Sequence, residues 1–328
     1  TIGPSGVGGS YTANSGVDGT LRPYVGATDT FNFNPANYLQ RPDDRYLIGL
    51  SGNYKLAEDL DVYTELSFMD DRTVAQIAAS GYFLGSGPVG GNFLVNCDNP
   101  LLDTGATESG TNVTPFNAIC GTAAPDNLGT TGTATVAIGR RFVETNLGRQ
   151  DDFKSTSYRV VGGARGQIED WDYDVFAQYG TTSTPRAYIN DVSRTRAQRA
   201  LLVVDNGGTP ICQSVIDGSD TSCLPANIFS FGELTADAIA YMSATGIQQT
   251  TTEEQIVNAS INGELGATVP WAVEAVSAAV GAEYRYTSLI HVSDDVFTSG
   301  DLLGQGGSTP NVNGHYDVWE VFGEVQIP

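Results

Sequence analysis

The chain has 328 residues, and its 38 acidic side chains against 16 Lys and Arg give a formal net charge of −22 at pH 7. It has no basic stripe with which to displace counterions from phosphates, so nucleic acid is excluded as a partner. No run of about 18 apolar residues is present, which excludes a transmembrane helix but leaves membrane-crossing strands open, because these need only about ten residues.

The first predicted elements are two strands, residues 45–55 and 60–72, in which apolar and polar side chains alternate. Only residues 56–59 separate the two segments. A connection this short predicts a tight hairpin.

Residues 139–146 also alternate, but their place in the chain argues against a full strand of the same sheet. A crossing here would reverse every later strand and turn the short connections outward. We therefore interpret this segment as a strand extension or a hairpin within an outer loop.

Two further hairpins and a last strand follow. In residues 156–168 one face is apolar or small and the other is largely polar, and a short turn at 169–172 leads into residues 173–182. The final set consists of residues 255–264 and 276–287, joined through 265–275, and a closing strand over 316–327.

Three long connections, residues 73–133, 183–252 and 288–315, are rich in Gly, Ser, Thr, Asn and Asp. Loops of this length are uncommon in compact domains and usually carry function. Short turns alternating with long loops are typical of outer-membrane barrels, whereas a soluble sandwich has more evenly spaced strands. The sequence therefore predicts an all-β, antiparallel transmembrane β-barrel, with residues 1–328 in one barrel domain and its long loops extracellular.

The second long connection is expected to contain helices. Thr235 is placed to cap a helix over residues 236–244, which Gly246 would end. Residues 194–204 form a second candidate helix.

The four cysteines form two pairs that are close in sequence: Cys97 with Cys120, and Cys212 with Cys223. Each pair lies in a loop-like stretch, which predicts two local disulfides in an oxidising compartment, with free thiols as the alternative. Each disulfide would stabilise by roughly 3 kcal/mol. No pair has CxxC spacing and the two histidines lie elsewhere, so neither a metal site nor a cofactor is expected.

Four stretches resemble barrel segments of TonB-dependent receptors, and they occur in the same order. They are residues 31–40 (FNFNPANYLQ), 223–229 (CLPANIF), 281–285 (GAEYR) and 319–328 (WEVFGEVQIP). The resemblance implies a segment of about eight strands from the middle of a 22-stranded barrel. The plug domain, the box that contacts the energising protein and the C-terminal barrel strands of that family are absent from this sequence.

The resemblance also implies a function: a receptor in the outer membrane of a Gram-negative bacterium, for active uptake of a scarce ligand such as a siderophore, cobalamin or a carbohydrate. Its partners would be outer-membrane lipid, its own plug domain, a TonB-type energising protein and the small-molecule ligand. The residues do not select the ligand or the oligomeric state. No positively charged, apolar leader is visible, so any secretion signal is expected to have been removed or to lie outside the sequence.

Five charged residues are expected to face a barrel interior, because a charge at the lipid midplane costs about 2–4 kcal/mol. They are Glu65, Arg159, Arg165, Glu283 and Arg285. One interpretation is a lumen that binds the plug or a substrate. The other is a wall of mutually paired charges that keeps the interior hydrated.

Two sets of loop residues have a functional and a structural interpretation. Residues 217–220 (DGSD) offer oxygen ligands for calcium, but without the spacing of a known loop, and are otherwise a solvated acidic turn. Tyr82, Phe83 and Phe93 either contact a ligand or pack the loop against itself.

An enzyme is not expected. Two isolated histidines give no arrangement of nucleophile, base and orienting group, and no GxSxG or P-loop pattern is present. Two other classes remain as alternatives to a receptor: a complete small outer-membrane barrel or an extracellular adhesin or structural β protein, and a secreted carbohydrate-binding β-sandwich. A complete barrel requires its first and last strands to pair, and a sandwich requires the apolar faces to meet in a dry core.

Overall fold

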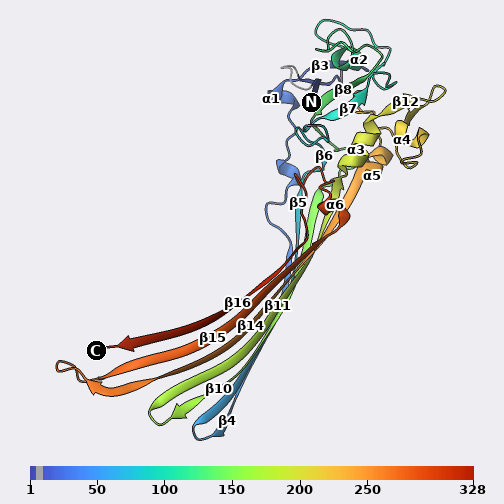
Figure 1. Ribbon diagram of the computed structural model, residues 1–328. Coiled ribbons are helices and arrows are strands. Elements are labelled where there is room, and N and C mark those ends of the chain that lie inside the picture. The colour runs from blue at the N-terminus through green and yellow to red at the C-terminus, as the bar shows by residue number, and fades with distance from the viewer. Residues whose placement is uncertain (5–9) are drawn as a thin grey trace.

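The computed structural model describes residues 1–4 and 10–328, and over them the chain is an all-β protein with antiparallel sheets. The largest sheet has seven strands and forms a long, curved blade, with the other elements gathered at one end (Figure 1). We call this gathered part the cap. It comprises the described residues up to 42, together with residues 78–148, 193–242 and 294–311.

The large sheet is an up-and-down meander in which every strand pairs with its neighbours in chain order. Its strands are β4 (Asp43–Ala57), β5 (Leu60–Ile77), β10 (Arg149–Ile168), β11 (Trp171–Val192), β14 (Ser243–Thr268), β15 (Ala275–Ser293) and β16 (Val312–Gln326). The three predicted hairpins are confirmed as β4–β5, β10–β11 and β14–β15. Their short turns lie at the end of the blade opposite the cap (Figure 1).

The sheet has seven strands where about eight were expected. Residues 31–40, which resemble a barrel segment, contain only the short 3-10 helix η1 (Asn34–Ala36), with Pro35 near its start. A proline has no N–H to donate to a strand ladder, and its fixed φ suits the first turn of a helix. This segment therefore leads into β4 as part of the cap.

The strands continue past their predicted ends, so the second and third connections are shorter than predicted, whereas the first begins and ends later than predicted. β5 reaches Ile77, β11 reaches Val192, and β14 begins at Ser243, so the connections are residues 78–148, 193–242 and 294–311. In residues 243–254 (SATGIQQTTTEE) both faces are largely polar, and the apolar alternation fades. Backbone pairing with β11 and β15 nevertheless continues there, so the strand persists where its sequence signal does not.

The cap contains a second antiparallel sheet of five short strands and several short helices. In spatial order the sheet is β3 (Leu21–Pro23), β2 (Tyr11–Ala13), β1 (Ile2–Pro4), β8 (Thr133–Ile138) and β7 (Phe93–Asn96). Two strand pairs accompany it: β6 (Gly81–Tyr82) with β9 (Arg140–Arg141), and β12 (Val203–Asp205) with β13 (Pro210–Cys212). The helices are α1 (Gly26–Asp29), α2 (Pro115–Ile119), α3 (Arg194–Leu201), α4 (Gln213–Ile216), α5 (Ala236–Met242) and α6 (Asp295–Thr298).

The predicted elements of these connections are present with different ends. Thr235 caps α5 as expected, accepting a hydrogen bond from the Ala238 N–H at 3.2 Å, but α5 ends at Met242 and not at Gly246. A strand takes over at once, because residues beyond Met242 pair with β11. The helix predicted over 194–204 ends at Leu201, and residues 139–146 hold the short strand β9 within the cap.

The main hydrophobic core of the described residues lies in the cap. Tyr82 stands near its centre, with its ring edge-on to Phe93 at 4.9 Å and its hydroxyl donating to the Ala197 carbonyl at 3.0 Å. Phe93 and Leu201 are fully buried. The core therefore packs the connection after β5 and the connection after β11 into one unit. The sequence predicted these connections only as separate loops.

Both disulfides that the spacing predicts are present, and both lie in the cap. The sulfur atoms are 2.07 Å apart in Cys97–Cys120 and 2.13 Å apart in Cys212–Cys223. The first closes a loop within the connection that follows β5, and the second closes the loop after β13 that contains α4. All four cysteines are buried, so the bonds are part of the packed cap.

Asp191 links the cap to the large sheet. Its carboxylate is fully buried near the cap end of β11, where it accepts hydrogen bonds from the Ser80 hydroxyl and from the Gly304 N–H at 3.0 Å. Ser80 belongs to the connection after β5, and Gly304 to the connection before β16. The side chain of Asp191 therefore holds two separate connections against strand β11.

Candidate functional site

The large sheet has two faces of opposite character. Successive side chains of a strand point to opposite sides, so the pairing register assigns each residue to one face. We call a row of directly paired residues across the strands a register level. On the first face, one such level contains Leu50, Leu66, Val160 and Tyr179. On the second face, the neighbouring level contains Ser51, Glu65, Val161 and Gln178. We call these the apolar face and the polar face.

Large side chains of the apolar face are open to the surroundings. Leu50 is 64% exposed, Val257 is 50% exposed and Val321 is 82% exposed. Between the short turns and mid-sheet, this face carries no charged residue on any of the seven described strands. A contiguous exposed apolar surface of this kind marks a site of interaction with another molecule or a membrane.

All five charged residues expected to share an interior surface lie on the polar face. Glu65 and Arg159 form an ion pair at 3.1 Å, and Glu283 and Arg285 form another at 2.6 Å. Arg165 lies over the Tyr63 ring, 5.5 Å from its centre. These contacts match the mutually paired wall more closely than a set of free charges awaiting a ligand.

Hydrogen bonds extend the paired charges across the polar face. Arg159 donates to Gln178 at 2.7 Å, and Gln178 donates to Glu254 at 3.0 Å, which links β10, β11 and β14. Further along, Asn258 donates to Glu283 at 3.0 Å. Gln178, Glu254 and Asn258 were not singled out from the sequence, although each is in phase with the charged positions of its strand.

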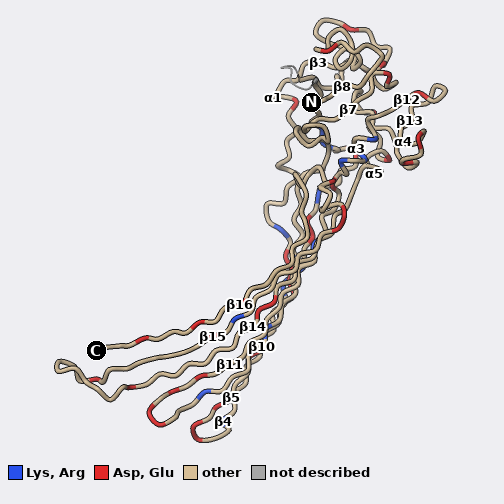
Figure 2. The backbone as a smooth tube through the Cα atoms, viewed as in Figure 1, with Lys and Arg blue, Asp and Glu red and all other residues tan. Residues whose placement is uncertain are grey.

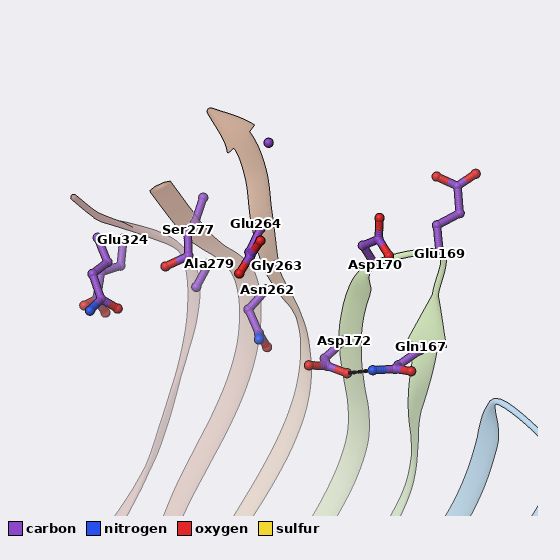
Figure 3. A pocket seen from close by; sticks show the side chains of 13 residues that line it. Gln167, Glu169, Asp170, Asp172, Asn262, Gly263, Glu264, Ser277, Ala279 and Glu324 are labelled. Atoms are coloured by element: carbon purple, nitrogen blue, oxygen red, sulfur yellow. Dashed lines mark hydrogen bonds between the residues drawn. The ribbon is translucent and has the colours of Figure 1, made fainter. Parts of the chain in front are cut away.

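The polar face is hollowed at the short-turn end of the sheet. Figure 3 shows this hollow, of about 820 Å³, with polar and acidic side chains from several strands around it. Gln167 donates to Asp172 across the β10–β11 hairpin at 2.9 Å. Acidic residues also mark the turns themselves, as Figure 2 shows for the β4–β5 and β10–β11 hairpins. The hollow indicates that the sheet curves toward its polar face here.

The two histidines do not form a site together. His291 lies on the polar face and shares a hydrogen bond of 2.8 Å with Thr250, whereas His315 stacks on Tyr286 of the apolar face at 5.6 Å. Among the described residues, no group of three or more His, Cys, Asp or Glu side chains is arranged to hold a metal ion.

The acidic turn at residues 217–220 is tied into the cap. Asp220 accepts hydrogen bonds from Ser222, from the Tyr241 hydroxyl at 2.9 Å and from Arg199 at 3.0 Å. These contacts, above all the hydrogen bond from Ser222, lower the pKa of Asp220 to about 2. The carboxylate thus joins the second disulfide loop to α3 and α5.

The loop aromatics serve different roles. Tyr82 and Phe93 are buried in the cap core, as the packing interpretation expects. Two guanidinium groups approach the Phe83 ring, with Arg141 at 4.6 Å and Arg149 at 5.1 Å from its centre. Burial and the nearby Arg149 charge lower the pKa of Arg141.

Fold and surface together define an all-β protein built on an open, antiparallel sheet with one exposed apolar face and one hydrogen-bonded polar face. No helix of the described residues is long and apolar enough to cross a membrane. No protein-family model matches the chain, and no curated protein sequence matches it.

Proposed function

We propose that the chain forms part of the wall and the outer loops of a TonB-dependent receptor, which takes up a scarce small molecule across the bacterial outer membrane. One observation carries the proposal. The sheet exposes a continuous apolar face on one side and curves toward a charged, hydrogen-bonded face on the other.

This polarity is opposite to that of a soluble curved sheet. A soluble sandwich or small barrel encloses apolar side chains on the concave side and shows polar ones to water. Here the charges of Glu65, Arg159 and Arg285 lie on the face that is hollowed at its short-turn end. A barrel with a hydrated interior and lipid outside has this arrangement, so the two faces favour a membrane wall over a carbohydrate-binding sandwich.

The direction of the edge strands favours a large barrel over a complete small one. Because the seven strands alternate in direction, β4 and β16 at the two edges run the same way. Closing the sheet on itself would pair these strands in parallel, whereas single-chain bacterial barrels have an even number of antiparallel strands. Among the described strands none covers the outer edge of β4 or β16. Further strands on both sides would complete the wall.

Receptor function rests on the cap and on the resemblance of residues 223–229, 281–285 and 319–328 to barrel segments of this family. The cap is a disulfide-tied unit at the opening of the proposed barrel, where an external ligand arrives first. Binding there, followed by movement of a plug driven by a TonB-type protein, is the mechanism that the resemblance implies. Siderophores, cobalamin and carbohydrates remain the ligand classes.

The test is to isolate the native protein from a purified outer-membrane fraction, and to determine its intact mass and map its peptides. The proposal expects these residues in a protein much heavier than the 34.6 kDa of this chain, with peptides from a plug domain. A mass near 34.6 kDa, or recovery from the secreted soluble fraction, would contradict it.

A further inference from the structure

On the apolar face, the charge-free region ends on the cap side along a line that runs obliquely across the sheet. Going from the cap toward the short turns, the last charged residue on this face is Asp44 on β4 and Asp317 on β16. A line drawn straight across the paired strands from Asp317 meets β4 at Leu50, six residues beyond Asp44. The limit therefore shifts by about one residue for each strand crossed.

Aromatic side chains follow the same oblique line. The set begins at Tyr46 on β4 and ends at Trp319 on β16, which is level with Gly52 of β4. Gly52 lies six residues beyond Tyr46, so the aromatic line has the same slope as the charge limit. Between its ends the line passes through Phe68, Tyr158, Tyr179 and Tyr286.

The slope converts into an angle. Six residues of strand span roughly 20 Å, and the six intervals between seven strands span roughly 29 Å, so a line with this slope is inclined by about 35° to the perpendicular of the strands. Strands of outer-membrane barrels are tilted by about 35–45° from the membrane normal. Tyr and Trp are the side chains that concentrate where hydrocarbon meets water.

We infer that the apolar face contacts the hydrocarbon layer of a lipid bilayer with its strands inclined about 35° to the membrane normal, and that the line from Tyr46 to Trp319 marks the boundary of that layer on the cap side. The inference rests on the proposed membrane location and adds the orientation. It places residues of one register level at different depths.

The height of the charge-free region supports a bilayer as the occupant. On β10 this region extends from the aromatic line at Tyr158 to Ile168 beside the short turn. Ten residue steps at this inclination reach roughly 27 Å along the membrane normal, close to the height of about 25 Å of the apolar band on outer-membrane barrels. A protein partner has no reason to impose this height together with an aromatic boundary.

The test compares two residues of one register level, Leu50 on β4 and Asp317 on β16. Single cysteines introduced by Leu50→Cys and Asp317→Cys carry a spin label, in the protein as isolated from the outer membrane and reconstituted in phosphatidylcholine vesicles. Accessibility to oxygen relative to a water-soluble nickel complex gives the depth of each label. Leu50 is exposed, so its substitution removes no core contact. Ser51→Cys is the control, because it lies beside Leu50 on the polar face.

The expected result is a label at position 50 deep in the hydrocarbon, a label at position 317 near the headgroups, and a difference of roughly 16 Å between them. The control label at position 51 should show no preference for oxygen. Equal depths for positions 50 and 317 would overturn the orientation while leaving the membrane location standing. If neither label on the apolar face senses lipid, the proposed function and the orientation both fail.

Discussion

The cap and the large sheet treat their apolar residues in opposite ways. In the cap, Phe93 and Leu201 are buried in a shared core that two disulfides reinforce, as in a water-soluble domain. In the sheet, Leu50 and Val321 are exposed, while charged residues bond to one another on the other face. The difference shows that the cap buries its apolar residues in a core of its own, whereas the described residues leave the apolar face of the sheet uncovered.

The largest expected effect separates the two regions by one kind of substitution. Phe93→Ala removes a fully buried ring and should destabilise the cap by about 3–5 kcal/mol, because it leaves a cavity in the core. Phe68→Ala, on the half-exposed apolar face, should leave the cap unchanged. Amide hydrogen exchange in the cap measures both variants. Equal protection of cap amides in wild type and Phe93→Ala would contradict the assignment of this core.

A second pair compares the two faces of the sheet at neighbouring positions of β14. Ala259→Arg places a charge on the apolar face near the middle of the proposed hydrocarbon layer and should cost about 2–4 kcal/mol in a bilayer, because the charge loses its hydration. Ser260→Arg places the same charge on the polar face beside Asp174, and should cost clearly less. Unfolding by urea from lipid vesicles gives both values. A larger cost for Ser260→Arg would reverse the assignment of the faces.

The disulfides should stabilise the cap and not the sheet. Replacing Cys97 and Cys120 together by Ser opens a loop of 23 residues and should cost the cap up to about 3 kcal/mol. The matched double replacement of Cys212 and Cys223 opens a loop of 11 residues and should cost less. Thermal unfolding followed by near-ultraviolet circular dichroism tests this order. Amide hydrogen exchange then locates the change. An equal loss of exchange protection in β14 and in the cap would show that the two regions do not unfold separately.

Acid should weaken the cap through Asp220. Its pKa is lowered to about 2 in the folded protein, by the hydrogen bond from Ser222 first and by those from Tyr241 and Arg199, compared with about 3.9 in an unfolded chain. A lowered folded pKa means that this carboxylate contributes stability above about pH 4 and that the contribution is lost as pH falls through about 2. Asp220→Asn should flatten the pH dependence of cap unfolding in this range, and an unchanged profile would remove Asp220 as its source.

The smallest effect is expected from a single ion pair of the polar face. Glu65 and Arg159 are about half exposed, so Glu65→Gln should change the free energy of unfolding by less than about 1 kcal/mol. A double-mutant cycle with Arg159→Gln isolates the pair. A coupling of several kcal/mol would show that this face is dehydrated, and would make it more like the cap.

The predictable parts of the fold are those where local pattern and tertiary environment agree. Residues 156–168 are predictable because apolar or small side chains alternate there with polar ones, and Thr235 because a helix N-terminus needs a side-chain acceptor. Residues 243–254 were missed because a strand with two polar faces lacks the alternation that reveals strands. There the pairing register with β11 and β15 supplies what the side chains do not show.

The cap could not be predicted as a unit for a different reason. Tyr82 and Ala197 are hydrogen-bonded although 115 residues separate them, and no local pattern encodes such a contact. The five charged residues of the polar face were identified because charges avoid lipid. Their partners Gln178 and Asn258 are neutral, and Glu254 lies in the polar stretch 243–254 that shows no alternation. Only the strand register shows that these three residues lie next to the five charges.

Asp191 gives the cap end of the large sheet a rigidity that the strands alone would lack. A row of hairpins joined only by backbone pairing can shear or fan apart at its free end. One buried carboxylate on β11 holds Ser80, in the connection after β5, and Gly304, in the connection before β16. We therefore expect the cap end of the sheet to be rigid. In the receptor proposed above, movement would then be confined to parts that lie inside the wall.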